Sequence, residues 1–326
     1  MNEIRQIKGG VCAAAGFTAG ATGCGIKTGE VTRDDLAIVF SEFPAAAAAT
    51  FTTNKVKAAP VRVSADHLRS GRVRAVVLNS GNANACTGQH GLDDARAMAA
   101  DTAAHLGLKP EQVLVCSTGR IGVPLPVARI RKGLLGIRLA RAGGTAAARA
   151  IMTSDTVAKE IAFDIRTEDG AFRIGGMAKG AGMIDPNMAT MLCVITTDAV
   201  VPRAALRQAL RESVEDSFNR ITIDGDMSTN DTVILLANAA AGWLPRRASS
   251  DPPWTGSPAL SPGGLSRTAR GSPASWRSRS AARRRRPMRV APPRRLPIPR
   301  SSNAPGPEAI RTGAASSMPS ATAARK

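Results

Sequence analysis

The part of this chain that can build a folded core ends near Trp243, where the composition changes abruptly. Residues 232–237 form the last apolar run typical of a buried strand. From Arg246 onward the chain carries 17 basic residues, two acidic residues and 13 of its 21 prolines, without helical or strand periodicity. A segment of this kind buries too little apolar surface to offset the entropy lost on ordering. We therefore expect a folded body over residues 1–242 and a disordered basic tail over residues 243–326.

The tail also holds most of the charge. The whole chain has a formal net charge of +19, whereas residues 1–245 contain 27 basic and 23 acidic residues and are close to neutral. The tail can be interpreted as an arm that binds nucleic acid or anionic lipid, as a linker, or as the out-of-frame translation of a GC-rich gene. The last interpretation is favoured, because basic runs alone are weak motifs and only Trp254 and Trp276 could stack on bases. Nucleic acid is therefore not an expected partner.

The body has the composition of a cytoplasmic protein. No apolar run approaches the length that spans a bilayer, and the N-terminus lacks the apolar core of a secretory signal. The cysteines are dispersed without a Cys-x-x-Cys pair, which favours reduced thiols buried as small apolar residues. They are Cys12, Cys24, Cys86, Cys116 and Cys193. The three histidines show no metal-ligand spacing with them, so we predict no metal site.

Apolar periodicity predicts alternating strands and helices. Strands are expected at residues 36–40, 74–78, 112–116, 191–195 and 232–237. Helices are expected at residues 92–106, 126–141 and 206–218, where apolar residues recur at helical spacing. This alternation predicts an α/β or α+β body. The polar stretch 79–84 is interpreted as a structural loop, and residues 117–119 as a turn after a strand.

One hydroxyl residue stands at a junction suited to nucleophilic chemistry. Residues 179–187 are rich in Gly, Pro and Asn, residues 191–195 predict a buried strand, and Thr190 lies between them. The small Ala189 leaves room for attack on the Ala189–Thr190 peptide bond. Cleavage there would place an α-amine, which titrates near pH 8, beside the Thr190 hydroxyl as its base. Taken alone, the pattern also fits an ordinary β-forming threonine.

Several further motifs occur in a fixed order along the body. They comprise residues 16–27, 35–39, 44–60, 79–88, 117–124, 153–156 and 224–232, in addition to residues 179–198. Together they resemble the ornithine acetyltransferase family, the bifunctional glutamate N-acetyltransferases of arginine biosynthesis. The resemblance covers about residues 1–242 and then stops, which indicates a chain truncated or frameshifted relative to the family.

The resemblance implies a fold and a mechanism. The fold would have layered sheets flanked by helices, as in acetyltransferases with an N-terminal threonine nucleophile. Self-cleavage would yield an alpha fragment, residues 1–189, and a beta fragment that starts with residues 190–242. Thr190 would carry an acetyl group from N2-acetylornithine to glutamate, with Thr118 and Gly119 as the oxyanion hole. Thr153, Lys179 and Thr190 would bind substrate, and Lys179 could pair with a substrate carboxylate.

The resemblance implies no bound cofactor, although acetyl-CoA is a second acetyl donor in bifunctional members. It implies a cytoplasmic heterotetramer of two alpha and two beta fragments. The segment 224–231 looks acidic but lacks the spacing and terminal Glu of a calcium loop, so we interpret it as a tight turn near the nucleophile. Later family residues that bind substrate, a Glu, an Asn and a hydroxyl residue, have no match in residues 243–326. We therefore expect the chain as written to be poorly folded or inactive.

Two other functions remain open from the residues alone. An N-terminal-nucleophile amidase or aminopeptidase would pass its acyl group to water instead of an amine. A non-catalytic fragment with a nucleic-acid-binding tail would bind with an affinity that falls steeply with salt. Formation of acetylglutamate from free glutamate separates the transferase from both.

Overall fold

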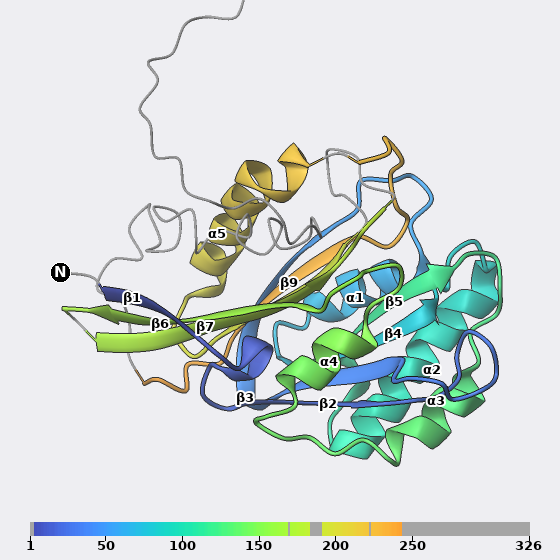
Figure 1. Cartoon of the computed structure of the whole chain (residues 1–326), viewed down its shortest axis with the longest axis horizontal. Coiled ribbons are helices and arrows are strands. Elements are labelled where there is room, and N and C mark those ends of the chain that lie inside the picture. Colours follow the sequence, from blue (N-terminus) through green and yellow to red (C-terminus); the bar gives the residue numbers. More distant parts are fainter. Residues whose placement is uncertain (1–2, 169, 183–190, 222, 243–326) are drawn as a thin grey trace, which may run out of the picture. The chain divides into compact units, whose positions relative to one another are not determined.

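The computed structural model describes residues 3–168, 170–182, 191–221 and 223–242. Within these residues, nine strands are hydrogen-bonded in the order β1-β6-β7-β8-β9-β3-β4-β5, and β2 also pairs with β3 (Figure 1). The strands are β1 (Glu3–Ile7), β2 (Phe17–Thr22), β3 (Leu36–Phe51), β4 (Val73–Asn82), β5 (Val113–Arg120), β6 (Lys159–Thr167), β7 (Gly170–Lys179), β8 (Leu192–Thr197) and β9 (Thr232–Ala237). The α-helices are α1 (Ala59–Leu68), α2 (Gly88–Leu106), α3 (Val127–Leu134), α4 (Gly144–Ala150) and α5 (Arg203–Asp216).

The long strand β3 joins two half-sheets. Its first residues pair with β2 and β4, and its last residues, from Ala46 to Phe51, pair with β9. The register shifts between Phe40 and Ala45, where the strand changes partners. We call β2, β4, β5 and the start of β3 the β4 half-sheet, and β1, β6 to β9 and the end of β3 the β8 half-sheet. Each contains one parallel pair, β4 with β5 and β8 with β9.

Alternating side chains show how the layers are stacked. In β4, Val76 and Leu78 enter a core shared with Val194 and Leu236 of the β8 half-sheet. The intervening Val77 faces the opposite way, into a core that also contains residues of α1, α2 and α3. In β8 and β9, the residues that alternate with Val194 and Leu236 pack against α5. The order is therefore helix, sheet, sheet, helix, which confirms the predicted layered fold flanked by helices (Figure 1).

Several elements differ in extent from the sequence-based prediction. The strand predicted at residues 36–40 continues through residues 44–51 to Phe51 as the single strand β3. The helix predicted over residues 126–141 ends at Leu134, where the Gly136 N–H donates to the Gly133 carbonyl at 2.9 Å and closes a turn. The strand predicted over residues 112–116 runs on to Arg120, so residues 117–119 are strand and not turn.

The polar stretch 79–84, which the sequence predicts to be a loop, lies partly within β4. Strand β4 continues through Asn82, because Gly81 and Asn82 still pair with the end of β5. The buried amide of Asn79 donates to the Asn82 carbonyl at 2.9 Å and thereby supplies a polar partner inside the core. Polar side chains can therefore be buried in a strand when they are hydrogen-bonded, which apolar periodicity does not reveal.

The cysteines and helices bear on two further expectations. Four cysteines are buried as expected, but Cys86, which lies in the loop just before α2, is exposed. All five thiols are free. Among the described residues, no helix is both long and apolar enough to cross a membrane.

The shared inner core predicts a large cost for shortening a side chain within it. Leu78 is 0% exposed and belongs to that core. Leu78→Ala should lower the free energy of unfolding by about 2–5 kcal/mol, because burial is lost and a cavity remains. Leu135→Ala, at an exposed position, is the control and should change it by less than about 0.5 kcal/mol. Equal effects in urea denaturation would contradict the assignment of the inner core.

Candidate active site

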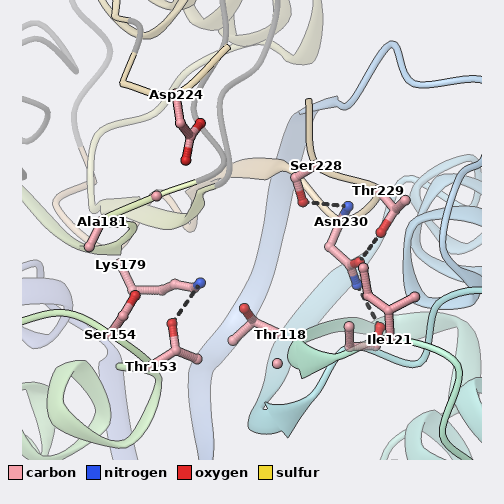
Figure 2. A pocket seen from close by; sticks show the side chains of 13 residues that line it. Thr118, Ile121, Thr153, Ser154, Lys179, Ala181, Asp224, Ser228, Thr229 and Asn230 are labelled. Carbon is pink, nitrogen blue, oxygen red and sulfur yellow. Dashed lines mark hydrogen bonds between the residues drawn. The ribbon is translucent and has the colours of Figure 1, made fainter. Parts of the chain in front are cut away.

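A pocket of about 350 Å³ opens where ends of the two half-sheets meet. The β4 half-sheet contributes Thr118 and Gly119, and the β8 half-sheet contributes Lys179 (Figure 2). Loops complete the lining with Ala83, Ile121, Thr153, Ser154, Ala181, Gly182, Asp224, Ser228, Thr229 and Asn230. The four candidate residues that the structure describes, Thr118, Gly119, Thr153 and Lys179, therefore line one pocket.

Thr118 and Gly119 reach the pocket at the end of β5. Their strand runs parallel to β4, with Gly119 opposite Gly81. Gly119 has a φ of +135°, and a Cβ on it would lie 2.2 Å from the Gly81 carbonyl carbon. Only glycine fits this close approach of two backbones. The Thr118 side chain, which is 6% exposed, is held beside the pocket by the same strand (Figure 2).

Lys179 is a buried cation and not a surface lysine. It ends β7, is 3% exposed, and its Nζ donates to Thr153 Oγ1 at 3.3 Å (Figure 2). Burial lowers the pKa of Lys179 to about 8, although the charges of Asp155 and Asp231 act in the opposite direction. The amine is therefore close to its charged–neutral transition near neutral pH.

A second buried cation next to Lys179 has its own counter-ion. Lys159 forms an ion pair with Asp155 and donates to the Gly180 carbonyl at 2.8 Å. Asp155 also accepts from the backbone N–H of Gly180 at 2.8 Å and of Thr153 at 3.1 Å. Burial disfavours the charge of Asp155, but these donors outweigh it and lower its pKa. The pair fixes the backbone on both sides of the Thr153–Lys179 contact.

Asp231 is a site residue that sequence analysis missed. It directly precedes β9, is 0% exposed, and its Oδ1 accepts from the Met191 N–H at 2.9 Å. Burial raises the pKa of Asp231 to about 7, while the Met191 amide, the charge of Lys179 and the Ser228 hydroxyl act in the opposite direction. The sequence signal was the last acid of the segment 224–231, which we had interpreted only as a tight turn.

Asn230 ties this segment to the other half-sheet. Its Nδ2 donates to the Ala83 carbonyl at 2.7 Å and to the Ser117 carbonyl at 2.9 Å. Ala83 follows β4 and Ser117 lies in β5 immediately before Thr118. A single buried amide therefore holds the pocket-lining residues 228–230 against the end of the β4 half-sheet.

Two candidate residues, Ala189 and Thr190, lie outside the described residues. The described residues on either side of them approach the site. Gly182 lines the pocket, and Met191 is hydrogen-bonded to Asp231. The predicted tail, residues 243–326, also lies outside the described residues.

Comparisons with known proteins identify the lineage. A family model described as the ArgJ family matches residues 18–255. The chain belongs to the ArgJ family. This confirms the resemblance drawn from the ordered motifs. Within the ArgJ family, the chain is 51% identical over 241 residues to an arginine biosynthesis bifunctional protein of Symbiobacterium thermophilum, covering 73% of this chain and 60% of the relative. It is 50% identical over 262 residues to the arginine biosynthesis bifunctional protein of Mycobacterium leprae, which covers 77% of this chain and 63% of that relative.

Two solved ArgJ-related structures are also similar. One is the arginine biosynthesis bifunctional protein of Bacillus halodurans, with a TM-score of 0.55 and 38% identity, covering 58% of this chain and 100% of that one. The other is an ornithine acetyltransferase of Mycobacterium tuberculosis in complex with ornithine, with a TM-score of 0.51 and 41% identity over the same shares. The chain spans about 60% of the length of the curated ArgJ relatives named above.

The close backbone approach at Gly119 predicts that this ArgJ site tolerates no side chain there. Gly119→Ala should lower the free energy of unfolding by about 2–4 kcal/mol, because the added Cβ meets the backbone of β4. Gly122→Ala is the matched control, since Gly122 also has a positive φ of 75° but open space around it. That variant should cost only about 1 kcal/mol of backbone strain. Thermal unfolding of both variants measures these losses of stability. Equal losses in the two variants would contradict the close approach of the two backbones.

The raised pKa of Asp231 predicts a dependence of stability on pH. The buried acid stays protonated up to about pH 7, whereas in the unfolded chain it loses its proton near its ordinary value of 3.8. Its contribution to stability is therefore present below that ordinary value and is lost as pH rises towards 7. Asp231→Asn cannot ionise. The stability of this variant relative to the parent should rise with pH, by up to about 1.4 kcal/mol per pH unit in this window.

Urea denaturation between pH 4.5 and 7 measures this difference. Asp66→Asn, at a side chain 62% exposed and outside the pocket, is the control and should show no such trend. A difference between the Asp231 variant and the parent that stays constant across the range would contradict the raised pKa.

Proposed function

We propose that the pocket is the acyl-transfer centre of an ornithine acetyltransferase that moves an acetyl group from N2-acetylornithine to glutamate. The observation that carries the proposal is the convergence of Thr118, Gly119, Thr153 and Lys179 on one pocket whose rim includes Gly182. Membership of the ArgJ family and the similarity to an ornithine acetyltransferase in complex with ornithine support the choice of substrates.

The proposed maturation makes the nucleophile. The Thr190 hydroxyl attacks the Ala189 carbonyl carbon, the Ala189–Thr190 C–N bond breaks, and an ester forms with the Thr190 oxygen. Water then hydrolyses the ester, which leaves the Ala189 carboxylate and a Thr190 with a free α-amine. That amine serves as the base for the adjacent hydroxyl. The alpha fragment, residues 1–189, and the beta fragment stay associated, since β7 and β8 are neighbours in one half-sheet.

The proposed transfer has two half-reactions. The Thr190 oxygen attacks the acetyl carbonyl of N2-acetylornithine, and the amine of ornithine leaves with a proton from the α-amine of Thr190. Ornithine departs, and the amine of glutamate attacks the acetyl ester, regenerating the free threonine. The sequence of steps predicts ping-pong kinetics. The polar groups of Thr118 and Gly119 would stabilise each tetrahedral oxyanion, and one such donor is typically worth about 3 kcal/mol.

Lys179 and Thr153 would hold the α-carboxylate that both substrates share. Asp155 is already paired with Lys159, whereas Lys179 donates to the hydroxyl of Thr153. A carboxylate arriving in the pocket would restore the charged form of the amine, because an opposite charge raises a lysine pKa. One anchor serving both substrates fits a reaction in which they bind in turn.

The assembly and location belong to the same proposal. We propose a cytoplasmic heterotetramer of two alpha and two beta fragments, with acetyl-CoA as a second donor that the assay below includes. The expectation of poor folding or low activity in the chain as written stays a prediction, and the same assay measures it against a full-length ArgJ relative.

The test is acetyl transfer by the purified 326-residue chain. With N2-acetylornithine and glutamate present, the proposal predicts acetylglutamate and ornithine in equal amounts, and no product from Thr190→Ala. Acetate formed in place of acetylglutamate would favour the amidase and contradict the transferase. Replacing the donor with acetyl-CoA tests the second activity in the same assay.

Substitution of the proposed carboxylate anchor should separate binding from chemistry. Lys179→Met should raise the KM for glutamate at least about tenfold, because a charged hydrogen-bonding partner of the substrate is lost. Lys132→Met, at an exposed position on α3 outside the pocket, should leave KM unchanged. A Lys179→Met enzyme with an unchanged KM would contradict the anchor.

A further inference from the structure

The backbone of Met191 is held on both sides by the residues that lead into β9. Its N–H donates to Asp231 Oδ1 at 2.9 Å, and its carbonyl accepts from the Thr232 N–H at 2.9 Å. Pairing of β8 with β9 begins one residue later, with Leu192 opposite Thr232. Met191 is thus fixed before the strand itself starts, at the position that directly follows Thr190 in the sequence.

A neutral side chain could supply the same acceptor, so the choice of a carboxylate needs a second reason. Asp231 is completely buried, and its Oδ2 has no hydrogen-bond partner among the described residues. Burying an ionised carboxylate costs free energy unless the charge is paired with an opposite charge or hydrogen-bonded. The charge of Lys179 acts on Asp231, and the charge of Asp231 acts on Lys179. Lys179 and Thr232 both pair with Leu192, so Asp231 directly precedes the β9 residue that lies across β8 from Lys179, and both Lys179 and Asp231 are buried.

We propose that Asp231 is a positioning residue with two separable effects: its Oδ1 fixes the backbone after Thr190, and its carboxylate, when ionised, favours the protonated form of the Lys179 amine. The catalytic role of Asp231 rests on the proposed function. Asp231 itself does not need to touch the substrate, because it acts through the Met191 amide and through Lys179.

The surroundings of Lys179 determine how the second effect is measured. The charged groups that influence its amine are Asp155, Asp231 and Lys159, and Asp224 also lines the pocket. Asp155 is bound to Lys159 and to two backbone amides, so it stays ionised at neutral pH. Asp231 is therefore the neighbour whose removal should change the protonation of Lys179 without breaking the Asp155–Lys159 pair.

Two substitutions separate the effects. Asp231→Asn keeps an oxygen acceptor for the Met191 N–H but removes the charge, whereas Asp231→Ala removes both. Asp198 provides the matched control at the other end of β8. It is also buried, and it accepts from the backbone N–H of Ala15 at 2.8 Å and of Arg173 at 2.7 Å, away from the pocket.

The experiment uses the full chain and three readouts: hydrogen–deuterium exchange of the Met191 amide, NMR titration of the Lys179 side chain, and the rate of cleavage at Ala189–Thr190. Asp231→Ala should speed exchange at Met191 at least about tenfold and slow cleavage by a similar factor. Asp231→Asn should keep the protection at Met191 but move the Lys179 titration to lower pH. Asp198→Asn should leave the Met191 exchange and the Lys179 titration unchanged even if it lowers the melting temperature.

Unchanged exchange at Met191 in folded Asp231→Ala, or an unchanged Lys179 titration in Asp231→Asn, would overturn the inference. If Asp231→Ala does not fold, Asp231→Asn and the Lys179 titration decide alone. The variants could show both responses, in Met191 exchange and in Lys179 titration, while the parent chain neither cleaves nor transfers acetyl groups. That result would refute the proposed function and leave the positioning effect established. The two failures are therefore distinguishable.

Discussion

The site depends on one strand that belongs to two half-sheets. Strand β3 pairs with β4 along its first residues and with β9 along its last ones, and the register shift after Phe40 lets the two parts follow different partners. The half-sheets then stack over a common core that contains Leu78 and Val194. This brings the end of β5 to the end of β7, although the two strands are five places apart in the strand order. Asn230 secures the junction with two buried hydrogen bonds.

Buried charge at this junction is arranged in two different ways. Asp155 and Lys159 neutralise each other and use their remaining hydrogen bonds on the backbone, which makes them structural. Lys179 and Asp231 lack such complete pairing, and burial moves their pKa values towards each other, to about 8 and about 7. A pair of groups near their transitions at neutral pH is typical of functional sites. The permanent pair thus provides a rigid support for two groups whose charge can respond to a ligand.

The sequence predicted strands and helices best where apolar periodicity decides the structure. Helix α2 and strands β4, β8 and β9 follow from such patterns, and the ordered motifs identified the family. Prediction failed where polar or small residues are buried by tertiary contacts. Asn79 allows β4 to continue as a buried strand, and Gly119 allows β5 to lie against it, but neither effect is encoded in local periodicity. The resemblance also pointed to Thr153 and Lys179 as substrate-binding residues. It did not predict the hydrogen bond between them, which joins residues 26 positions apart in the sequence. Asp231 was missed because its role depends on the distant Met191 amide.

The central claim is that Thr190 carries the acetyl group in this pocket, next to the residues that bind the substrate carboxylate. The most direct measurement is to incubate the purified chain with N2-acetylornithine labelled in its acetyl group, quench in acid, and map the peptides by mass spectrometry. We expect a new N-terminus at Thr190 and one labelled acetyl group on that residue, which is removed when glutamate is added. An uncut Ala189–Thr190 bond with no label on Thr190 would contradict it.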